Sequence, residues 1–521
     1  MSFSSPRTIS RLMRTSRELY TEGPKYLLRH TAKLTREPNV PSFVAFMRVN
    51  DPKRCQLLKR LEISTGRLSE AEADGLEKFL LDFGPRLKIT RLTIDRAEEL
   101  FESSRGLSGV FSLISSVKHL TVSEIGRRAN TFLINSRSSL KSASLFMIPQ
   151  PFDDDSAASS DSDSSDNSSD SEDDDDDDFR NPIVQLHASQ ATLETLSVRY
   201  CDTFSDAGLA HVYPHVYPRV HALTLTASEA PAPAHYAHAF PAVRTLTLEC
   251  DPRELDALGA DFADLRALRA LNASQLAGAW TGVEEVRGTL MDHFLLGLGG
   301  LVERVHVSGP FMDKRMWRLM LLDCRPAYVN FQGFDVDLFF DGEFKRLMRG
   351  HFLESVRCFE IMVFFGGMLE PDSVDAPEAL NALIDGIGKM PSLRSFGLTL
   401  CCYGLQPGLE DILFNHDRPR NSLCAAEEYL RELDLDAFAL RIQKRVPRLE
   451  TISISLIGHR ARPSAFATLG ADVEYAEGAV ERIPLRHGSR IDVFNAFDPA
   501  KILRNMSLFQ DGAICALNKI K

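Results

Sequence analysis

Residues 193–201 read Leu193-Glu-Thr-Leu196-Ser-Val198-Arg-Tyr-Cys201, and this stretch contains the pattern that predicts the fold. Apolar residues occupy the first, fourth and sixth positions of a hexad, and the last two alternate with polar residues, as in a strand with one buried face. The hexad has ten further good matches: Leu58/Leu61/Ile63, Ile89/Leu92/Ile94, Val117/Leu120/Val122, Val220/Leu223/Leu225, Val243/Leu246/Leu248, Val302/Val305/Val307, Val356/Phe359/Ile361, Leu393/Phe396/Leu398, Leu430/Leu433/Leu435 and Leu449/Ile452/Ile454. Four weaker matches are Leu140/Ala143/Leu145, Leu265/Leu268, Val283/Val286 and Val329/Phe331.

The spacing of the hexads leaves room for one strand and one helix or loop per unit. Their central residues are 31, 28, 27 and 23 residues apart between the pairs 61/92, 92/120, 196/223 and 223/246. Residues 69–83, 311–322 and 376–390 have apolar residues at helical spacing. Strands that alternate with helices on one side imply parallel strands in a stacked array. The alternative is an open α/β sheet, which a phosphate-binding turn would favour, but no GxxxxGK[ST] motif occurs.

The net negative charge of the chain comes from one segment. The formal net charge is −12, yet residues 153–178 alone contain 14 acidic residues and nine serines without any Lys or Arg. Without this run, 58 acidic residues face 60 basic ones, so the rest of the chain carries a formal charge of +2. Because the run has almost no apolar residues, we expect residues 151–181 to be a disordered acidic insertion in a loop of the array.

The acidic insertion has three interpretations. It is a tether for a basic partner, an intramolecular shield over basic residues of the sheet, or a tolerated insertion that aids solubility. Three of its serines have an acid three residues further on and are candidate phosphorylation sites: Ser160, Ser169 and Ser171. Since the rest of the chain has no excess of basic residues, nucleic-acid binding is not expected.

The composition points away from several other classes of protein. The longest apolar stretches, residues 361–369 and 294–302, have about half of the roughly 18–20 residues that span a bilayer. No secretory signal is recognisable, although Arg7, Arg11, Arg14 and Arg17 weakly resemble a mitochondrial presequence. The nine cysteines are odd in number, scattered and without a CxxC motif, so reduced thiols in the cytoplasm or nucleus are expected.

The sequence contains no recognised catalytic constellation. Neither HExxH nor GxSxG occurs, and we expect no enzyme activity and no cofactor. Five histidines cluster within 28 residues: His211, His215, His221, His235 and His238. Pro214 and Pro218 each remove a backbone donor and so disfavour a helical metal site there, and we interpret the segment as a stiffened connection between two units.

If the hexads are strands, polar residues between and beside the buried positions form a solvated sheet face. Such a face suits protein recognition better than catalysis, and plain solubility is the alternative interpretation. The candidate partner-binding residues are a hydroxyl-rich group with nearby basic residues and one acidic end: Arg199, Thr224, Thr226, Thr245, Thr247, Glu249, Arg304, His306, Glu432, Asp434 and Asp436.

The hexads resemble leucine-rich repeats. Residues 193–201 include the Cys that these repeats allow at the ninth position, and Leu393-Arg-Ser-Phe396-Gly-Leu398-Thr-Leu-Cys401 matches in the same way. Most other units lack the ninth-position Asn or Cys, and the spacing grows to 37 residues between Phe359, Phe396 and Leu433. The resemblance implies an α/β fold, an irregular leucine-rich-repeat-like solenoid with a parallel sheet on one side and helices on the other.

The N-terminal segment resembles part of an F-box. Residues 8–28, Thr-Ile-Ser-Arg-Leu-Met-Arg-Thr-Ser-Arg-Glu-Leu-Tyr-Thr-Glu-Gly-Pro-Lys-Tyr-Leu-Leu, are similar to its second half, as found in F-box/leucine-rich-repeat proteins of mushroom-forming fungi. The Leu-Pro-containing first helix of an F-box is missing, so either the gene model is truncated or that half has been lost. A helical cap over the end of the array is the alternative, since such an end needs covering.

The resemblance implies a substrate-recognition subunit of a cullin-RING ubiquitin ligase that binds a Skp-type adaptor and, through it, a cullin. The adaptor-binding residues would be Leu12, Met13, Leu19 and Tyr20. A stand-alone scaffold without a ligase role is the alternative. The expected organisation is a helical cap over residues 1–50, the solenoid over 51–480 with the acidic insertion at 151–181, and a closing segment over 481–521.

Overall fold

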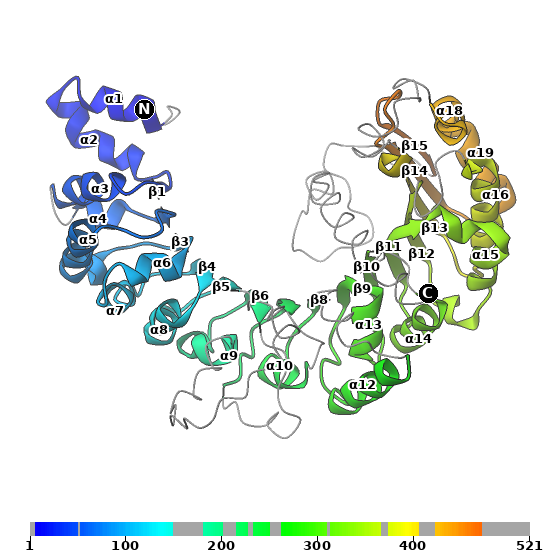
Figure 1. Cartoon of the computed structure of the whole chain (residues 1–521), viewed down its shortest axis with the longest axis horizontal. Coiled ribbons are helices and arrows are strands. Elements are labelled where there is room, and N and C mark those ends of the chain that lie inside the picture. Colours follow the sequence, from blue (N-terminus) through cyan, green and yellow to red (C-terminus); the bar gives the residue numbers. More distant parts are fainter. Residues whose placement is uncertain are drawn as a thin grey trace, which may run out of the picture.

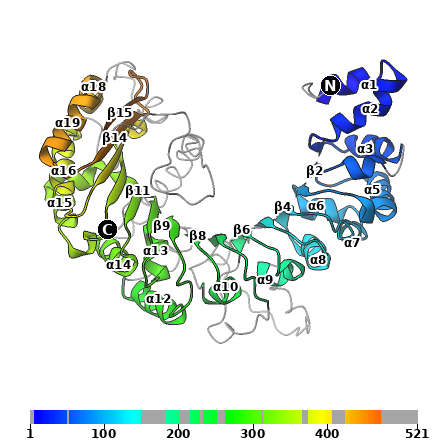
Figure 2. The same cartoon turned by 180° about the vertical axis from the view of Figure 1, so that it is seen from behind.

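The structure is a computed structural model that describes residues 6–49, 53–148, 181–201, 215–227, 233–250, 262–309, 313–365, 373–405 and 423–470. One sheet of 15 strands runs through all of it, and each strand pairs with the next strand along the chain. The sheet forms an arc, with the strands along its inner side and the helices along its outer side (Figure 1). The view from behind shows the same arrangement (Figure 2). The predicted α/β class is therefore confirmed.

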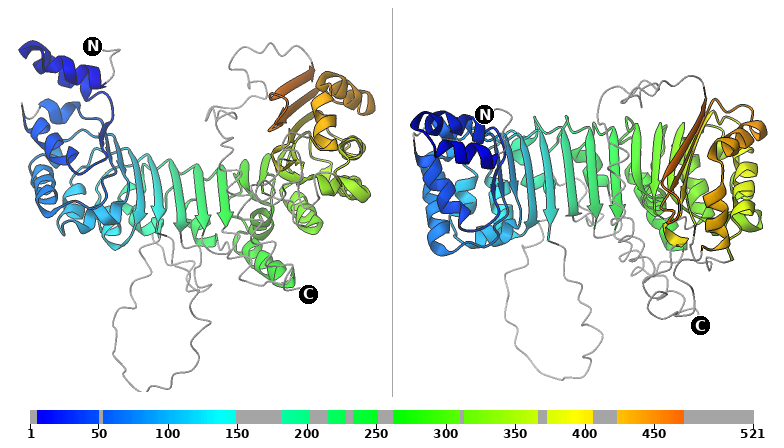
Figure 3. Two further views of the ribbon diagram at one scale, coloured as in Figure 1. Left: turned by 45° about the horizontal axis from the view of Figure 1, so that its top comes forward. Right: turned by 90° about the horizontal axis from the view of Figure 1, so that it is seen from above.

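The strands are parallel from β1 to β14, and β15 pairs antiparallel with β14. Seen from above, they lie side by side with a common direction over most of the sheet (Figure 3). Their bounds are β1 Ala32–Leu34, β2 Arg60–Ile63, β3 Arg91–Ile94, β4 His119–Ile125, β5 Ser142–Met147, β6 Thr195–Cys201, β7 Ala222–Ala227, β8 Thr245–Cys250, β9 Glu285–Thr289, β10 Arg304–Ser308, β11 Tyr328–Asp335, β12 Cys358–Phe364, β13 Ser395–Cys401, β14 Thr451–Ile457 and β15 Ala465–Gly470.

Helices follow most of the strands and cover the outer face of the sheet (Figure 1). The α-helices are α1 Pro6–Met13, α2 Arg17–Leu27, α3 Asn39–Arg48, α4 Lys53–Leu57, α5 Glu70–Phe83, α6 Ala97–Glu102, α7 Leu107–Phe111, α8 Arg127–Asn135, α9 Pro182–Gln185, α10 Ala234–Ala239, α12 Phe262–Gln275, α13 Leu290–Leu296, α14 Lys314–Cys324, α15 Glu343–Leu347, α16 Ala376–Ile387, α18 Ala425–Glu432 and α19 Leu435–Arg445. Short 3-10 helices are η1 Gly84–Arg86, η4 His187–Ser189, η5 Val336–Gly342, η6 His351–Leu353 and η8 Tyr403–Leu405. The three helices expected from apolar spacing are present as α5, α14 and α16.

The hydrophobic core lies between the sheet and the outer helices, and the hexads supply its sheet side. Their central residues stand opposite one another in register from Leu61 through Leu92 and Leu120 to Phe396 and Ile452, and all of these are buried. Strands form at ten of the eleven good hexads and at three of the four weaker ones, as predicted. Burying one apolar row from every strand under the helices stabilises the whole array.

Two hexads do not form strands. Leu430, Leu433 and Leu435 span the end of α18 and the start of α19, and Leu265 and Leu268 lie within α12. Local capping explains the first case, because the Asp434 side chain accepts hydrogen bonds from the first amides of α19. Since apolar residues three apart also fit one face of a helix, the hexad alone does not distinguish the two structures.

The ends of the array differ in part from the expected boundaries. Strand β1 already pairs with β2, so the sheet begins within the segment that was predicted to be only a cap. Helices α1 and α2 lie beyond it, at the N-terminal end of the arc (Figure 1). Of the predicted acidic insertion only Asn181 is described, and the closing segment 481–521 lies outside the described residues. Among the helices that the structure describes, none has the length and apolarity to cross a membrane.

Candidate functional site on the inner face of the sheet

Alternate residues of the strands point away from the helices and form the inner face of the arc. Since side chains alternate along a strand, the residues on either side of each buried central residue lie on this face. The register places one inner-face row across neighbouring strands: Glu62, Thr93, Thr121, Ser144, Ser197, Thr224, Thr247, Arg287, His306, Asn330, Glu360, Gly397 and Ser453. Apart from Gly397, these residues are half-buried.

The structure brings six of the predicted partner-binding residues together on β6, β7 and β8. Thr224 stands opposite Thr247, and Thr226 stands between Arg199 and Glu249. Thr245 lies on the same face of β8. The Arg199 guanidinium lies 5.0 Å from the ring centroid of Phe146 on β5. This hydroxyl-rich group is therefore one continuous patch of the inner face.

The remaining predicted residues fall into two places. Arg304 and His306 lie on β10, further along the same face. Glu432, Asp434 and Asp436 do not lie on the sheet, because their hexad forms the junction of α18 and α19. The expected acidic end of the sheet face is therefore wrong, and Asp434 instead serves as the N-cap of α19.

Four neighbouring strands, β9 to β12, carry a connected polar group that we call the β9–β12 cluster. Glu285 Oε1 lies 2.6 Å from an Arg287 nitrogen and 3.1 Å from His306 Nε2. The His306 ring lies 5.3 Å from that of Tyr328, whose hydroxyl donates to Glu360 Oε2 at 2.5 Å. The members of this cluster are Glu285, Arg287, His306, Tyr328, Asn330 and Glu360, and Asn330 Nδ2 donates to the same Glu360 oxygen at 2.7 Å.

Burial and contacts between neighbouring side chains set the protonation states in and beside the β9–β12 cluster. Burial would raise the pKa of Glu285, but the hydrogen bond from His306 and the charge of Arg287 lower it to about 2. Burial and the neighbouring Glu360 carboxylate raise the pKa of the Tyr328 hydroxyl, and they raise that of the adjacent Cys358 thiol to about 12. At neutral pH Glu285 is thus an ionised carboxylate, whereas the Tyr328 phenol and the adjacent Cys358 thiol stay protonated, which suits hydrogen bonding rather than nucleophilic attack.

Gly397 on β13 makes room for the Glu360 side chain. A Cβ at this position would lie 2.8 Å from Glu360 Cγ and 3.3 Å from Ser453 Oγ. Glu360 therefore reaches over the glycine while its carboxylate accepts the two hydrogen bonds from β11. The hexads around Val286 and Val329 are weak matches. The sequence therefore did not single out the residues that flank these valines as members of a polar cluster.

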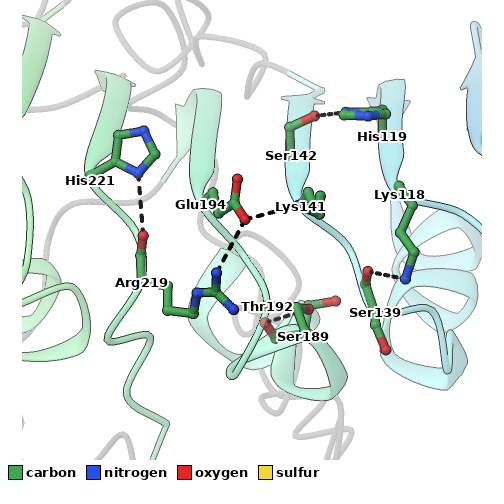
Figure 4. A network of polar contacts seen from close by, with 10 residues as sticks. All are labelled: Lys118, His119, Ser139, Lys141, Ser142, Ser189, Thr192, Glu194, Arg219 and His221. Carbon is green, nitrogen blue, oxygen red and sulfur yellow. Dashed lines mark hydrogen bonds and ion pairs between the residues drawn. The ribbon is translucent and has the colours of Figure 1, made fainter. Parts of the chain in front are cut away.

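A second polar network lies at the edge where the strands begin, between β4 and β7 (Figure 4). Glu194 accepts from Lys141 Nζ at 3.2 Å and lies 3.5 Å from Arg219. His119 Nδ1 and Ser142 Oγ are 2.8 Å apart, and Lys118 Nζ donates to the Ser139 carbonyl at 3.2 Å. Lysines of successive units thus line this edge, with one carboxylate shared between Lys141 and Arg219.

The predicted adaptor-binding residues differ in exposure. Met13 is buried against Gly23 of α2, so it holds α1 and α2 together and is not available to a partner. Leu12 and Leu19 are half-buried, and Tyr20 is 40% exposed. The Tyr20 ring lies 5.4 Å from the guanidinium of the buried Arg54. Three of the four predicted side chains therefore remain accessible on the N-terminal helices.

The histidine segment does not form a metal site in the part of the chain that the structure describes. His211 and the three candidate phosphorylation sites, Ser160, Ser169 and Ser171, lie outside the described residues. The rings of His215 and His187 lie 5.8 Å apart, and the buried His235 packs on Tyr236. Among the described residues, no group of three or more His, Cys, Asp or Glu side chains could hold a metal ion.

Compared with known proteins, the chain matches no protein-family model and no curated protein sequence. The functional argument therefore starts from the residues of the inner face and of the N-terminal helices.

Proposed function

We propose that the chain is a non-catalytic protein-interaction module, an irregular leucine-rich-repeat-like solenoid whose inner face binds another protein. The observation that carries this proposal is the register of the sheet, which joins half-buried polar side chains of successive strands into one continuous surface. Stacked-unit proteins use concave surfaces of this kind for binding. Tyrosine and arginine held in place by neighbours, as in the β9–β12 cluster, are typical of the residues that dominate protein interfaces.

Charge reversal on the inner face tests this proposal. Arg199 on β6 and Arg441 on the outer helix α19 are both exposed, and each lies near a phenylalanine ring. Partners captured by the full chain should be lost with Arg199→Glu and kept with the matched control Arg441→Glu, as measured by quantitative mass spectrometry. If no captured partner depends on Arg199 or on any other inner-face residue, the proposal fails.

Within this role, we propose that the chain is the substrate-recognition subunit of a cullin-RING ubiquitin ligase. The support is the resemblance of residues 8–28 to part of an F-box, together with the accessible Leu12, Leu19 and Tyr20 on two helices at one end of the arc. In that arrangement the N-terminal helices bind a Skp-type adaptor while the inner face holds the target. A stand-alone scaffold without a ligase role is the second candidate, favoured by the burial of Met13.

Binding of a purified Skp-type adaptor separates these two candidates. Calorimetry with the full chain should give a measurable affinity that Leu12→Asp weakens at least tenfold. Leu440 on α19 is 55% exposed and far from the N-terminal helices, so Leu440→Asp is the matched control and should bind normally. An adaptor that does not bind the wild-type chain would exclude the ligase role and leave the scaffold.

A further inference from the structure

Basic side chains gather where the strands of the N-terminal half begin. We call this surface the basic edge, and it consists of Lys59, Arg60, Lys88, Arg91, Lys118, His119 and Lys141, which lie on or just before β2, β3, β4 and β5. Most of these side chains are exposed, and Lys118 and His119 are half-buried. The sequence spreads the seven residues over more than 80 positions in a region without unusual net charge.

The register of the parallel strands aligns these residues. Arg60 stands opposite Arg91, and Arg91 stands opposite His119. Lys59, Lys118 and Lys141 each precede a strand directly and therefore lie at the same edge. Neighbouring strands are about 4.8 Å apart, so β2 to β5 present these cations along roughly 15 Å.

The charge of the basic edge is largely uncompensated. Within the described residues, Lys59, Arg60, Lys88 and Arg91 make no ion pair, and the Glu62 carboxylate on β2 pairs with Lys33 at 2.8 Å. Of the seven residues of the basic edge, only Lys141 has an acidic partner in the described part of the chain: it pairs with Glu194, which it shares with Arg219. A solvated cation without a partner carboxylate can bind an external one at the cost of little desolvation.

Further along the edge where the strands begin, two basic residues do have acidic partners. Arg244 lies 3.5 Å from Glu284, and Arg394 lies 3.6 Å from Glu450. These pairs neutralise two positions of the edge in the C-terminal half of the sheet, where Arg357 before β12 is exposed and pairs with no acid in the part of the chain that the structure describes. Unpaired cations on successive strands are therefore a feature of β2 to β4.

The pKa of His119 reflects both its burial and its positively charged neighbours at the basic edge. Partial burial lowers the pKa of this imidazole, and the charges of Arg91 and Lys141 lower it further. A second positive charge is thus disfavoured beside the existing ones. An incoming carboxylate would relieve the same repulsion.

We propose that the basic edge binds a short acidic peptide segment of a partner protein, laid across β2 to β5. An extended peptide of about five residues covers roughly 15 Å, which matches the length of the basic edge from β2 to β5. Nucleic acid fits less well, because it requires a broad basic footprint and this edge is bounded by Glu62 and Glu194. The inference rests on the proposed protein-binding role of the sheet and is independent of the ligase role.

Fluorescence anisotropy with a labelled polyglutamate peptide and the full chain tests this inference. The double variant Arg60→Gln/Arg91→Gln should weaken binding about five- to tenfold, since exposed ion pairs contribute roughly 0.2–1 kcal/mol each. The matched control Arg244→Gln/Arg394→Gln removes the same total charge from paired positions and should change the affinity less than twofold. Added salt should weaken wild-type binding, because the cations are exposed.

Several outcomes would overturn the inference. Equal losses in the two double variants would mean unspecific attraction, and unchanged affinity in both would mean that the peptide binds elsewhere. Tighter, Arg60-dependent binding of a single-stranded oligonucleotide would replace the peptide with nucleic acid as the ligand. Peptide binding seen only after deletion of residues 153–178 would assign the edge to the acidic run of the chain itself. The adaptor titration is a separate measurement, so its failure leaves this result unaffected.

Discussion

His293 supports the inner face from behind, and its titration gives a measurable prediction. This residue of α13 is 4% exposed, and its Nε2 lies 2.9 Å from the carbonyl oxygen of His306, a member of the β9–β12 cluster. Burial lowers the pKa of His293 to about 4, although the hydrogen bond to His306 acts in the opposite direction. The neutral imidazole, with its proton on Nε2, is therefore the form that fits the folded protein.

Acidification should destabilise the protein through this residue. Between pH 6.5, its ordinary pKa, and about 4, the unfolded chain binds a proton that the folded chain does not, so the stability falls as the pH falls. Working the linkage from pH 7 to pH 5 gives a loss of about 2 kcal/mol from this one group. The contribution of His293 to the free energy of unfolding is present above pH 6.5 and is lost as the pH falls from 6.5 to about 4.

The difference between wild type and His293→Gln isolates this effect. Glutamine keeps an N–H donor for the His306 carbonyl but does not titrate, so the variant should lack the loss of about 2 kcal/mol on going from pH 7 to pH 5. The adjacent buried Asp292 acts with the opposite sign, because burial raises its pKa to about 6. Its contribution is common to both proteins and cancels in the difference.

Urea denaturation at pH 7 and pH 5 provides the two free energies of unfolding for each protein. The wild type should lose stability relative to His293→Gln on acidification. A difference that does not change with pH, or that changes in favour of the wild type at pH 5, would refute the argument that His293 is buried in its neutral form.

Two further predictions concern single contacts of the core. Gly288→Ala should lower the free energy of unfolding by about 1–3 kcal/mol, because the new Cβ would clash with the backbone oxygen of Leu248. In urea denaturation, the control Gly109→Ala should be neutral or stabilising by up to about 1 kcal/mol, because its Cβ meets nothing within 4 Å; equal effects of both changes would contradict the clash. Tyr217→Phe should cost about 1–2 kcal/mol and lower Tm, since the buried hydroxyl donates to the Ile183 carbonyl at 2.6 Å. An unchanged Tm would mean that this hydrogen bond contributes no net stability.

The sheet could be predicted because its signal is local. A buried pair such as Leu196 and Val198 needs only period-two alternation, and the same short pattern occurs wherever a strand crosses the core. The failure at residues 430–435 has a local cause as well, because the Asp434 cap and the apolar spacing fit a helix. Strand β1, Ala32–Leu34, was missed because three residues are too few to show a period.

The inner-face site could be predicted only in part. Thr224 and Thr247 were expected to lie together because successive hexads repeat the same position. The contacts of Glu285 and Glu360 could not be foreseen, since these depend on which residues the register places beside His306 and Tyr328.

The sequence by itself determined the α/β class, the parallel array and the apolar row under the helices, because each unit repeats these features within a few residues. It also showed that the excess of acidic over basic residues comes from residues 153–178. Only the tertiary structure decided which charges meet. Parallel pairing brings Arg60, Arg91 and Lys118 to one edge although they lie in three separate units. Charge acts over distances in space, and the register of the sheet converts positions far apart in the chain into neighbours about 5 Å apart.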